Sequence, residues 1–258
     1  MLAPTVGGGH PCSFKNRAVQ ADANAMGQFQ APSYEDGTAP ISGATIARFR
    51  VGPIPVRVEF PFFLVIVLIG YNSHQSVTLL LTWVGVAFGS VLLHELGHAI
   101  VGRAFGSPTS IVLYAFGGLT FHNGGRWLTA RQDVLISLAG SLSQIVLLGI
   151  PAYMITHHST LIFTSYGWYV FFWDLMWVSL GWGIINLLPI LPLDGGNIAV
   201  TLLRRTRLDD PVRLARQLSV GAALGLAIWA YHTTGWFGAL WALGFAIWNA
   251  AALTKNQV

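Results

Sequence analysis

The chain has 258 residues, of which 53% are hydrophobic and only 9% are Asp, Glu, Lys or Arg, with a formal net charge of +4. A soluble globular domain carries roughly 25% charged residues. The composition therefore excludes an ordinary water-exposed surface and predicts a polytopic membrane protein in a lipid bilayer. A single cysteine, Cys12, excludes an intrachain disulfide, and we expect no nucleic-acid partner.

The first fifty residues differ in composition from the rest. They are rich in Gly, Ala, Pro, Ser and Gln and show no apolar periodicity. Because such a segment buries little apolar surface, we expect residues 1–50 to be disordered or loosely attached, ahead of a membrane domain over residues 51–258. A basic stretch followed by an apolar one is missing at the start, so no signal peptide is expected.

Six apolar blocks follow, and we expect each to be a transmembrane helix. A helix needs about 20 apolar residues to span a bilayer, so the first and fifth blocks are short. The blocks are 60–71, 76–102, 134–155, 168–188, 218–231 and 236–253.

The placement of the basic residues supports the count of six. The fourteen Lys and Arg residues lie in 1–57, 103–131, 204–216 and at Lys255, whereas the links 72–75, 156–160 and 232–235 contain none. With six spans, every basic residue falls on one side, which the positive-inside rule makes cytoplasmic. We therefore predict an all-α polytopic membrane protein with both termini in the cytoplasm. The short loops suggest a prokaryotic inner membrane.

The second block contains the motif HELGH. His94 and His98 are four residues apart, so on a helix they share one face and can both bind one zinc ion. Glu95 can take a proton from a water that attacks a carbonyl. Ionisable groups at membrane depth cost about 2.5–3.5 kcal/mol each, which favours a functional role over the alternative of two core histidines bonded to neighbouring helices.

A zinc site needs a third ligand, and Asp194 is the best candidate. It follows an apolar helix broken by two prolines, and Gly195 and Gly196 after it allow a tight turn. The six-span topology places Asp194 at about the depth of His98, near the cytoplasmic face. The alternative is that Asp194 only caps a helix starting near Asn197.

HELGH in a second span, with N-x-x-P-x-x-P-x-D-G-G closing a fourth, resembles the site-2 protease family of intramembrane zinc metalloproteases. The likeness covers about residues 51–255. It implies one zinc ion per chain held by His94, His98 and Asp194, with Glu95 as the general base for attack by a zinc-bound water. The substrate would be a transmembrane protein cut in or near its membrane segment, as in regulated intramembrane proteolysis. The sequence suggests a compact form without a PDZ or C-terminal regulatory domain.

Two further positions match or depart from that family's patterns. Asn186 matches an Asn thought to help position substrate, although an interhelical hydrogen bond would also explain it. The segment LAGSLSQ resembles the pattern A-G-P-x-x-N, with Ser141 in place of Pro and Gln144 in place of Asn. If that Asn contacts the scissile carbonyl, Gln144 must bind substrate across one more methylene.

Two short β-prone runs, 111–114 and 119–121, flank Gly117 and Gly118 and predict a hairpin between spans two and three. Open backbone groups cannot face lipid, so an apolar hairpin here would be re-entrant and lie beside the active site. Its edge could then pair with an unwound substrate strand, with Gly118 in contact with substrate. The family has a similar element at this place. A surface loop is the alternative.

Two other functions remain open. A metal transporter could use the same ligands, but the far halves of spans two and four offer little polarity beyond Asp174. An inactive, protease-like membrane binding protein is also possible, although the intact Glu95 argues against it. The oligomeric state is not indicated by the sequence.

Overall fold

The structure is a computed structural model that describes residues 44–71, 76–122 and 128–255. These residues belong to one compact unit. The predicted N-terminal segment 1–50, with Cys12, lies mostly outside the described residues. Its last residues belong to a β-strand, β1 (Thr45–Val51), so regular structure begins earlier than the composition suggested.

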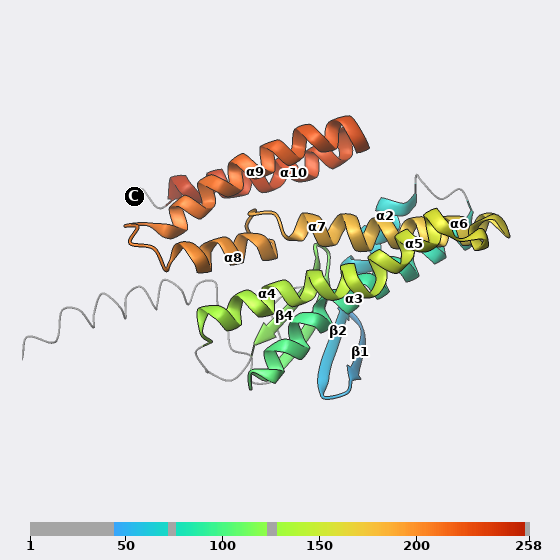
Figure 1. Ribbon diagram of the computed structural model, residues 1–258, viewed down its shortest axis with the longest axis horizontal. Coiled ribbons are helices and arrows are strands. Elements are labelled where there is room, and N and C mark those ends of the chain that lie inside the picture. Colours follow the sequence, from blue (N-terminus) through green and yellow to red (C-terminus); the bar gives the residue numbers. More distant parts are fainter. Residues whose placement is uncertain (1–43, 72–75, 123–127, 256–258) are drawn as a thin grey trace, which may run out of the picture. The chain divides into compact units, whose positions relative to one another are not determined.

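All six apolar blocks are helical, as predicted (Figure 1). Three continuous helical stretches are long and apolar enough to cross a membrane: Val77–Ala104, Ala130–His158 and Tyr166–Asn186. The first block is a shorter apolar helix. The helices are α2 (Phe60–Tyr71), α3 (Val77–Ala104), α4 (Ala130–Gln144), α5 (Ile150–His158), α6 (Tyr166–Met176), α7 (Trp182–Asn186), α8 (Asp194–Leu203), α9 (Pro211–Thr234) and α10 (Trp236–Lys255). A short 3₁₀ turn, η2 (Thr160–Phe163), links α5 to α6.

Two of the long stretches contain a π-helical turn. The turn η1 (Ile145–Gly149) joins α4 to α5, and η3 (Trp177–Gly181) joins α6 to α7. The two turns pack against each other. Because a π-turn shifts hydrogen bonds from i+4 to i+5, it alters which backbone carbonyls are available to side chains, and such turns are frequent at functional sites.

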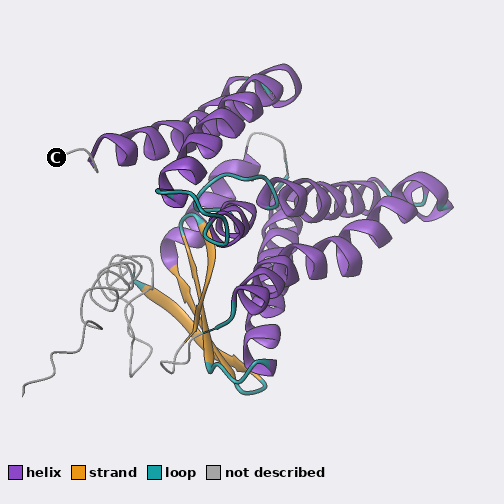
Figure 2. Cartoon of the chain, turned by 60° about the vertical axis from the view of Figure 1, so that its left-hand side comes forward, coloured by secondary structure: helices purple, strands orange, loops and turns teal. Residues whose placement is uncertain are grey.

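The predicted hairpin is present, and it belongs to a larger sheet than expected. β3 (Thr109–Tyr114) and β4 (Gly117–His122) pair in antiparallel register. β2 (Ile54–Glu59) runs parallel to β3 and antiparallel to β1, which gives the strand order β1-β2-β3-β4. The all-α prediction is therefore corrected to a mostly helical fold with one four-stranded sheet, which Figure 2 shows in orange.

The sheet packs on the helix that carries HELGH. Ile54, Val56 and Val58 alternate on the buried face of β2, and they join Phe62 of α2 and Ala99 of α3 in one apolar core. Both β3 and β4 contact α3. The parallel β2–β3 pair needs a long crossover connection, which α2 and α3 provide. The sheet thus brings the hairpin against the C-terminal half of α3.

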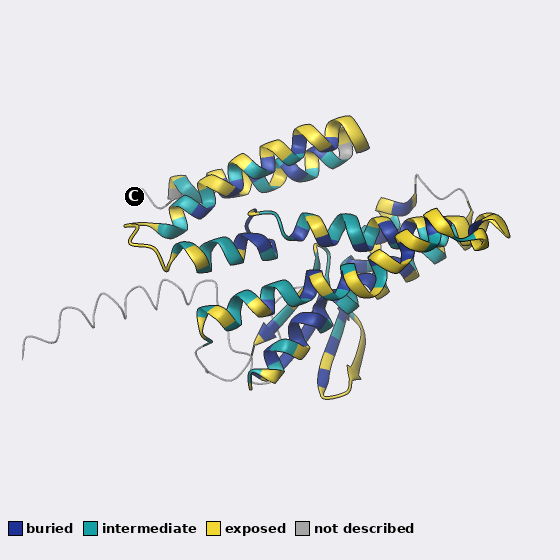
Figure 3. Ribbon diagram, viewed as in Figure 1, coloured by how far each residue is buried: buried dark blue, intermediate teal, exposed yellow. Residues whose placement is uncertain are grey.

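Large apolar side chains remain exposed on the outer faces of the helices, including Leu68 of α2 and Leu81 of α3, which are 62% and 65% exposed. Figure 3 shows that exposed residues recur along these helices while buried ones gather where α3 meets the sheet. Such apolar outer faces suit lipid better than water and indicate an integral membrane protein.

Candidate metal centre and active site

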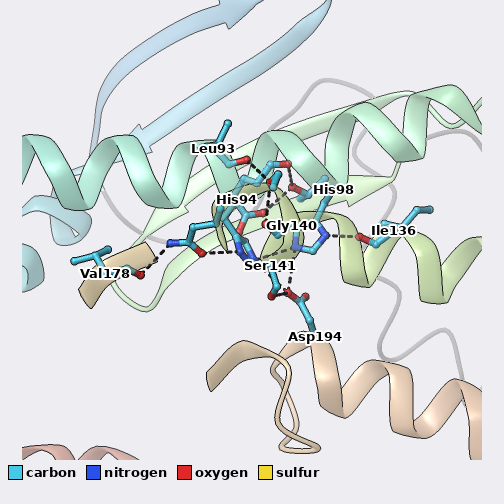
Figure 4. A network of polar contacts seen from close by, with 12 residues as sticks. Leu93, His94, His98, Ile136, Gly140, Ser141, Val178 and Asp194 are labelled. Atoms are coloured by element: carbon cyan, nitrogen blue, oxygen red, sulfur yellow. Dashed lines mark hydrogen bonds and ion pairs between the residues drawn. The ribbon is translucent and has the colours of Figure 1, made fainter. Parts of the chain in front are cut away.

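Three side chains from two helices converge on one point (Figure 4). His94 and His98 lie one turn apart on α3, and Asp194 is the first residue of α8. The Nε2 atoms of the two histidines are 3.0 Å apart. Asp194 Oδ2 lies 3.2 Å from Nε2 of His94 and 3.4 Å from Nε2 of His98. The sequence-predicted ligands are therefore brought together.

The outer nitrogens of both histidines are held by other groups. His98 Nδ1 is 2.7 Å from the carbonyl oxygen of Ile136, and His94 Nδ1 is 3.2 Å from Oε1 of Gln144. Both partners are acceptors, so each Nδ1 carries the proton and donates it. The lone pair of each Nε2 is then directed inward, toward the other histidine and Asp194.

This donor set fits a zinc ion. Two imidazole lone pairs and a carboxylate oxygen repel one another at these distances unless a cation lies between them. Ligands about 2.0–2.1 Å from a tetrahedral zinc ion are roughly 3.3–3.4 Å apart. The observed separations of 3.0, 3.2 and 3.4 Å are close to that value. Two histidines with one carboxylate are a known catalytic zinc set that leaves a fourth position open.

Glu95 follows His94 on α3 and contacts the hairpin. Its carboxylate belongs to the same cluster of possible ligand atoms, within 4.8 Å of those of His94 and His98. Thr120 of β4 donates a hydrogen bond of 2.6 Å to Glu95 Oε2. A side chain at Gly118 would collide with the Glu95 carboxylate, so the hairpin backbone passes directly over it.

Glu95 also affects the pKa of a neighbouring side chain, that of Tyr114. Burial raises the pKa of the Tyr114 phenol, because the phenolate would be poorly solvated, and the negative charge of Glu95 raises the pKa further. Tyr114 pairs with Gly117 at the hairpin turn. The carboxylate of Glu95 therefore lies against the backbone of Gly118 and near a phenol whose neutral form is favoured.

Asp194 is positioned by unusually close backbone packing. Helix α8 begins at Asp194 itself, not near Asn197, and its cap residue Leu193 makes no side-chain cap. A side chain at Gly195 would collide with the carbonyl groups of Leu187 and Leu188, just after α7, and one at Gly196 would collide with the backbone of Ile190 and Leu191. These glycines therefore permit helix–backbone contact, whereas the tight turn expected of them is replaced by the first turn of α8, in which neither has a positive φ.

The remaining predicted residues have different surroundings. Asn186 is buried, and its side chain makes no hydrogen bond within the part of the chain that the structure describes. Gln144 is fully buried with both ends of its amide engaged, because its Nε2 also donates to the carbonyl oxygen of Val178 at 3.2 Å. A side chain at Gly140 would collide with the His98 ring.

Some functional neighbours were not predicted from the sequence. Thr120 sits in the hairpin without a motif to mark it. The Ile136 and Val178 contacts use backbone carbonyls, which the residue type does not reveal. Ser141 was noted only as a departure from a pattern, yet its hydroxyl lies 3.4 Å from Asp194 Oδ2.

Comparison with known proteins supports the same assignment. Residues 153–228 match the family model Peptidase family M50. The chain is 36% identical over 181 residues to the "Putative zinc metalloprotease Rip3" of Mycobacterium tuberculosis, covering 65% of this chain and 44% of that protein. It is 26% identical over 163 residues to a zinc metalloprotease of Methanocaldococcus jannaschii, covering 62% and 46%. The matches thus span less than half the length of these relatives.

A solved structure shares the fold. The site-2 protease from Methanocaldococcus jannaschii aligns with a TM-score of 0.55 and 22% sequence identity, over 81% of this chain and 95% of that one. The chain therefore has a site-2 protease-like fold. Together the comparisons confirm the resemblance based on HELGH and the Asp194 motif: residues 153–228 match Peptidase family M50, the relatives are named zinc metalloproteases, and the fold is like that of a site-2 protease.

Proposed function

We propose that the chain is an intramembrane zinc metalloprotease that hydrolyses a peptide bond in or near the transmembrane segment of a membrane protein. One observation carries the proposal. The Nε2 atoms of His94 and His98 are 3.0 Å apart and lie 3.2 and 3.4 Å from Oδ2 of Asp194. The carboxylate of Glu95 lies in the same cluster of possible ligand atoms as the two histidines. A zinc ion, one per chain, is the partner that suits this donor set.

Glu95 is suited to the proton-transfer steps. A zinc ion bound by His94, His98 and Asp194 would lower the pKa of water and polarise a carbonyl oxygen. Glu95 accepts the proton of the attacking water and later delivers it to the leaving amine. The hydrogen bond from Thr120 holds Oε2, so Oε1 is the oxygen left to move the proton.

The hairpin is suited to presenting the substrate. A helical substrate hides its peptide bonds in its own hydrogen bonds, so it must be unwound before it can be cut. Among the strands that the structure describes, β4 is at the edge of the sheet, beside β3. An unwound substrate can add to such an edge as a further strand. The close approach of Gly118 to Glu95 would then place the substrate backbone near the base.

The roles of the other predicted residues follow from their positions. Asn186 is a buried amide with free hydrogen-bonding capacity within the described residues, which suits a contact to substrate. Gln144 is bonded to His94 and Val178, so a contact to substrate would require it to give up one of them. We therefore keep Asn186 as the stronger candidate for binding substrate.

The membrane arrangement that we propose has six spans. Three helical stretches meet the length and composition of a span. Helices α2, α9 and α10 supply the other three, with both termini and all basic loops on the cytoplasmic side. The metal centre, near the end of α3 that carries Arg103, then lies toward the cytoplasm of a prokaryotic inner membrane.

The deciding experiment compares cells that express the unaltered chain with cells that express Glu95→Gln. Mass spectrometry of membrane and soluble fractions should find new termini inside transmembrane segments only with the unaltered chain. The zinc content of both purified proteins should be about one per chain. Zinc binding without any cleavage that depends on Glu95 would favour the inactive binding protein, and zinc uptake into proteoliposomes would favour the transporter.

A further inference from the structure

The segment between α7 and α8 leads directly into Asp194, and the backbone of one of its residues is hydrogen-bonded to side chains of other helices. The N–H groups of the other non-proline residues bond within the segment or to the end of α7: Leu187 to Ile184, Leu188 to Ile185, Ile190 to Leu188 and Leu193 to Ile190. Leu191 differs. Its N–H donates to Oγ of Ser219 at 3.0 Å, and its carbonyl oxygen accepts from Nδ2 of Asn249 at 2.7 Å.

Ser219 and Asn249 come from two helices that carry no metal ligand. Ser219 lies on α9 and is 0% exposed, and Asn249 lies on α10 and is 3% exposed. Each has a second bond within its own helix, to the carbonyl oxygens of Ala215 and Phe245. A buried polar side chain is costly unless it is hydrogen-bonded, so these contacts fix both side chains and, with them, the backbone of Leu191.

The position of Leu191 determines that of Asp194. Gly196, in the first turn of α8, packs so closely on Ile190 and Leu191 that a Cβ there would lie 2.5 Å from the nitrogen of Leu191. Pro192, which follows Leu191, has a fixed φ. The first turn of α8 is thus held against a backbone that α9 and α10 hold in turn, and Asp194 opens that turn.

Apolar contacts follow the same path. Ile190 and Leu193, on either side of Leu191, form one buried cluster with Ala223 of α9 and Ala246 of α10. Polar and apolar contacts therefore converge on the residues just before Asp194.

We propose that Ser219 and Asn249 are positioning residues that hold Asp194 in the geometry required of the third metal ligand. The proposal rests on the proposed function for the identity of the metal site. It gives α9 and α10 a role at the metal centre, because without the two side chains the N–H and carbonyl groups of Leu191 would lose their partners and the first turn of α8 would be free to shift. Loss of a partner bonded directly to a metal ligand costs about 10–100-fold in metal affinity, and we expect an effect at the low end of this range because these contacts act through Leu191.

The test uses three variants of the full chain in detergent. Asn249→Leu and Ser219→Ala each remove one contact to Leu191. Thr156→Val is the matched control, because it also removes a buried hydroxyl, whose bond stays within its own helix at Ala152. Zinc affinity is measured by competition with a chelator, and the visible absorption of the cobalt-loaded proteins reports the ligand geometry.

We expect about tenfold weaker zinc binding and an altered cobalt spectrum in both Leu191-contact variants, with neither change in Thr156→Val. Affinity within twofold of the unaltered chain in both variants, with the same spectrum, would overturn the proposal. Two variants on separate helices keep the test decisive if one of them fails to fold.

A measurement without metal separates this proposal from the proposed function. Hydrogen exchange of the metal-free proteins should become faster over residues 190–197 in Asn249→Leu and Ser219→Ala and remain unchanged in Thr156→Val. If the unaltered chain binds no zinc, the proposed function fails, and the exchange result alone decides whether α9 and α10 anchor this segment. Unchanged exchange in both variants would show that they do not.

Discussion

The hydroxyl of Thr120 lies 2.6 Å from Oε2 of Glu95 and 3.1 Å from the backbone oxygen of Glu95, so its single proton is shared between these two acceptors. One strand residue thus holds both the side chain and the backbone of the residue assigned as general base. Because the side-chain hydrogen bonds of Thr120 within the described residues go to Glu95 and to neither histidine, its effect on proton transfer can be separated from metal binding.

Thr120→Val should therefore lower the rate of cleavage while zinc content stays at about one per chain. We expect a loss of about tenfold, since valine keeps the shape of threonine but cannot hold Oε2, and misplaced catalytic groups are costly. Thr120→Ser keeps the hydroxyl and should retain most of the activity. Equal rates in the valine and serine variants would remove Thr120 from the active site.

His94→Ala and Asp194→Ala should each lose zinc. Removing either ligand leaves two donors from the protein, which is one fewer than catalytic zinc sites normally have. Atomic absorption on purified protein would show less than about a tenth of the zinc of the unaltered chain, with elution in size-exclusion chromatography as the test of folding. Zinc retained without Asp194 would require another third ligand and would leave that residue to open α8.

Substitutions at two glycines should separate an effect on the metal ligand His98 from an effect on the base Glu95. Gly140→Ala places a methyl group against the His98 ring and should weaken zinc binding, whereas Gly118→Ala places one against the Glu95 carboxylate and should abolish cleavage with zinc still bound. Gly221→Ala is the control, because its Cβ meets nothing within 4 Å. It should leave zinc binding and cleavage unchanged and stabilise α9 by roughly 0.5–1 kcal/mol. Normal zinc affinity in Gly140→Ala would show that the ring of His98 can move freely.

The helices could be predicted because apolar runs and helix-compatible spacing are local properties. The first block, 60–71, matches α2 to the residue. The sheet was only half predicted, because β2 pairs with β3 across the two helices between them, and no local pattern reports such a contact. The alternation Ile54, Val56, Val58 was present, but it lay beside a segment whose composition suggested disorder.

At the metal centre, too, local sequence patterns predicted some residues, whereas contacts between distant segments could not be predicted. The spacing of His94 and His98 predicted a shared face, and charge placement predicted the depth of Asp194, so the ligands followed from periodicity and topology. The groups that orient the two histidines could not be predicted in this way. Ile136 acts through its carbonyl oxygen and Gln144 through a bond to a π-helical turn, and neither depends on a pattern in the sequence.

The structure and the sequence suggest different roles for Gln144, and substitutions at this residue can separate them. Its Oε1 accepts from His94 Nδ1, and its Nε2 donates to Val178 within the π-helical turn η3. Asparagine is one methylene shorter and cannot span both partners. Gln144→Asn should therefore weaken zinc binding about tenfold, as loss of a hydrogen bond to a ligating histidine does.

Gln144→Glu is the matched comparison, because it keeps the length and the acceptor for His94 but cannot donate to Val178 as a carboxylate. It should bind zinc more tightly than Gln144→Asn. If Gln144 instead contacts the scissile carbonyl of the substrate, as the sequence suggested, both variants would keep full zinc affinity and lose only kcat/KM. Chelator competition on the two variants, followed by cleavage kinetics, separates a residue that orients His94 from one that binds substrate.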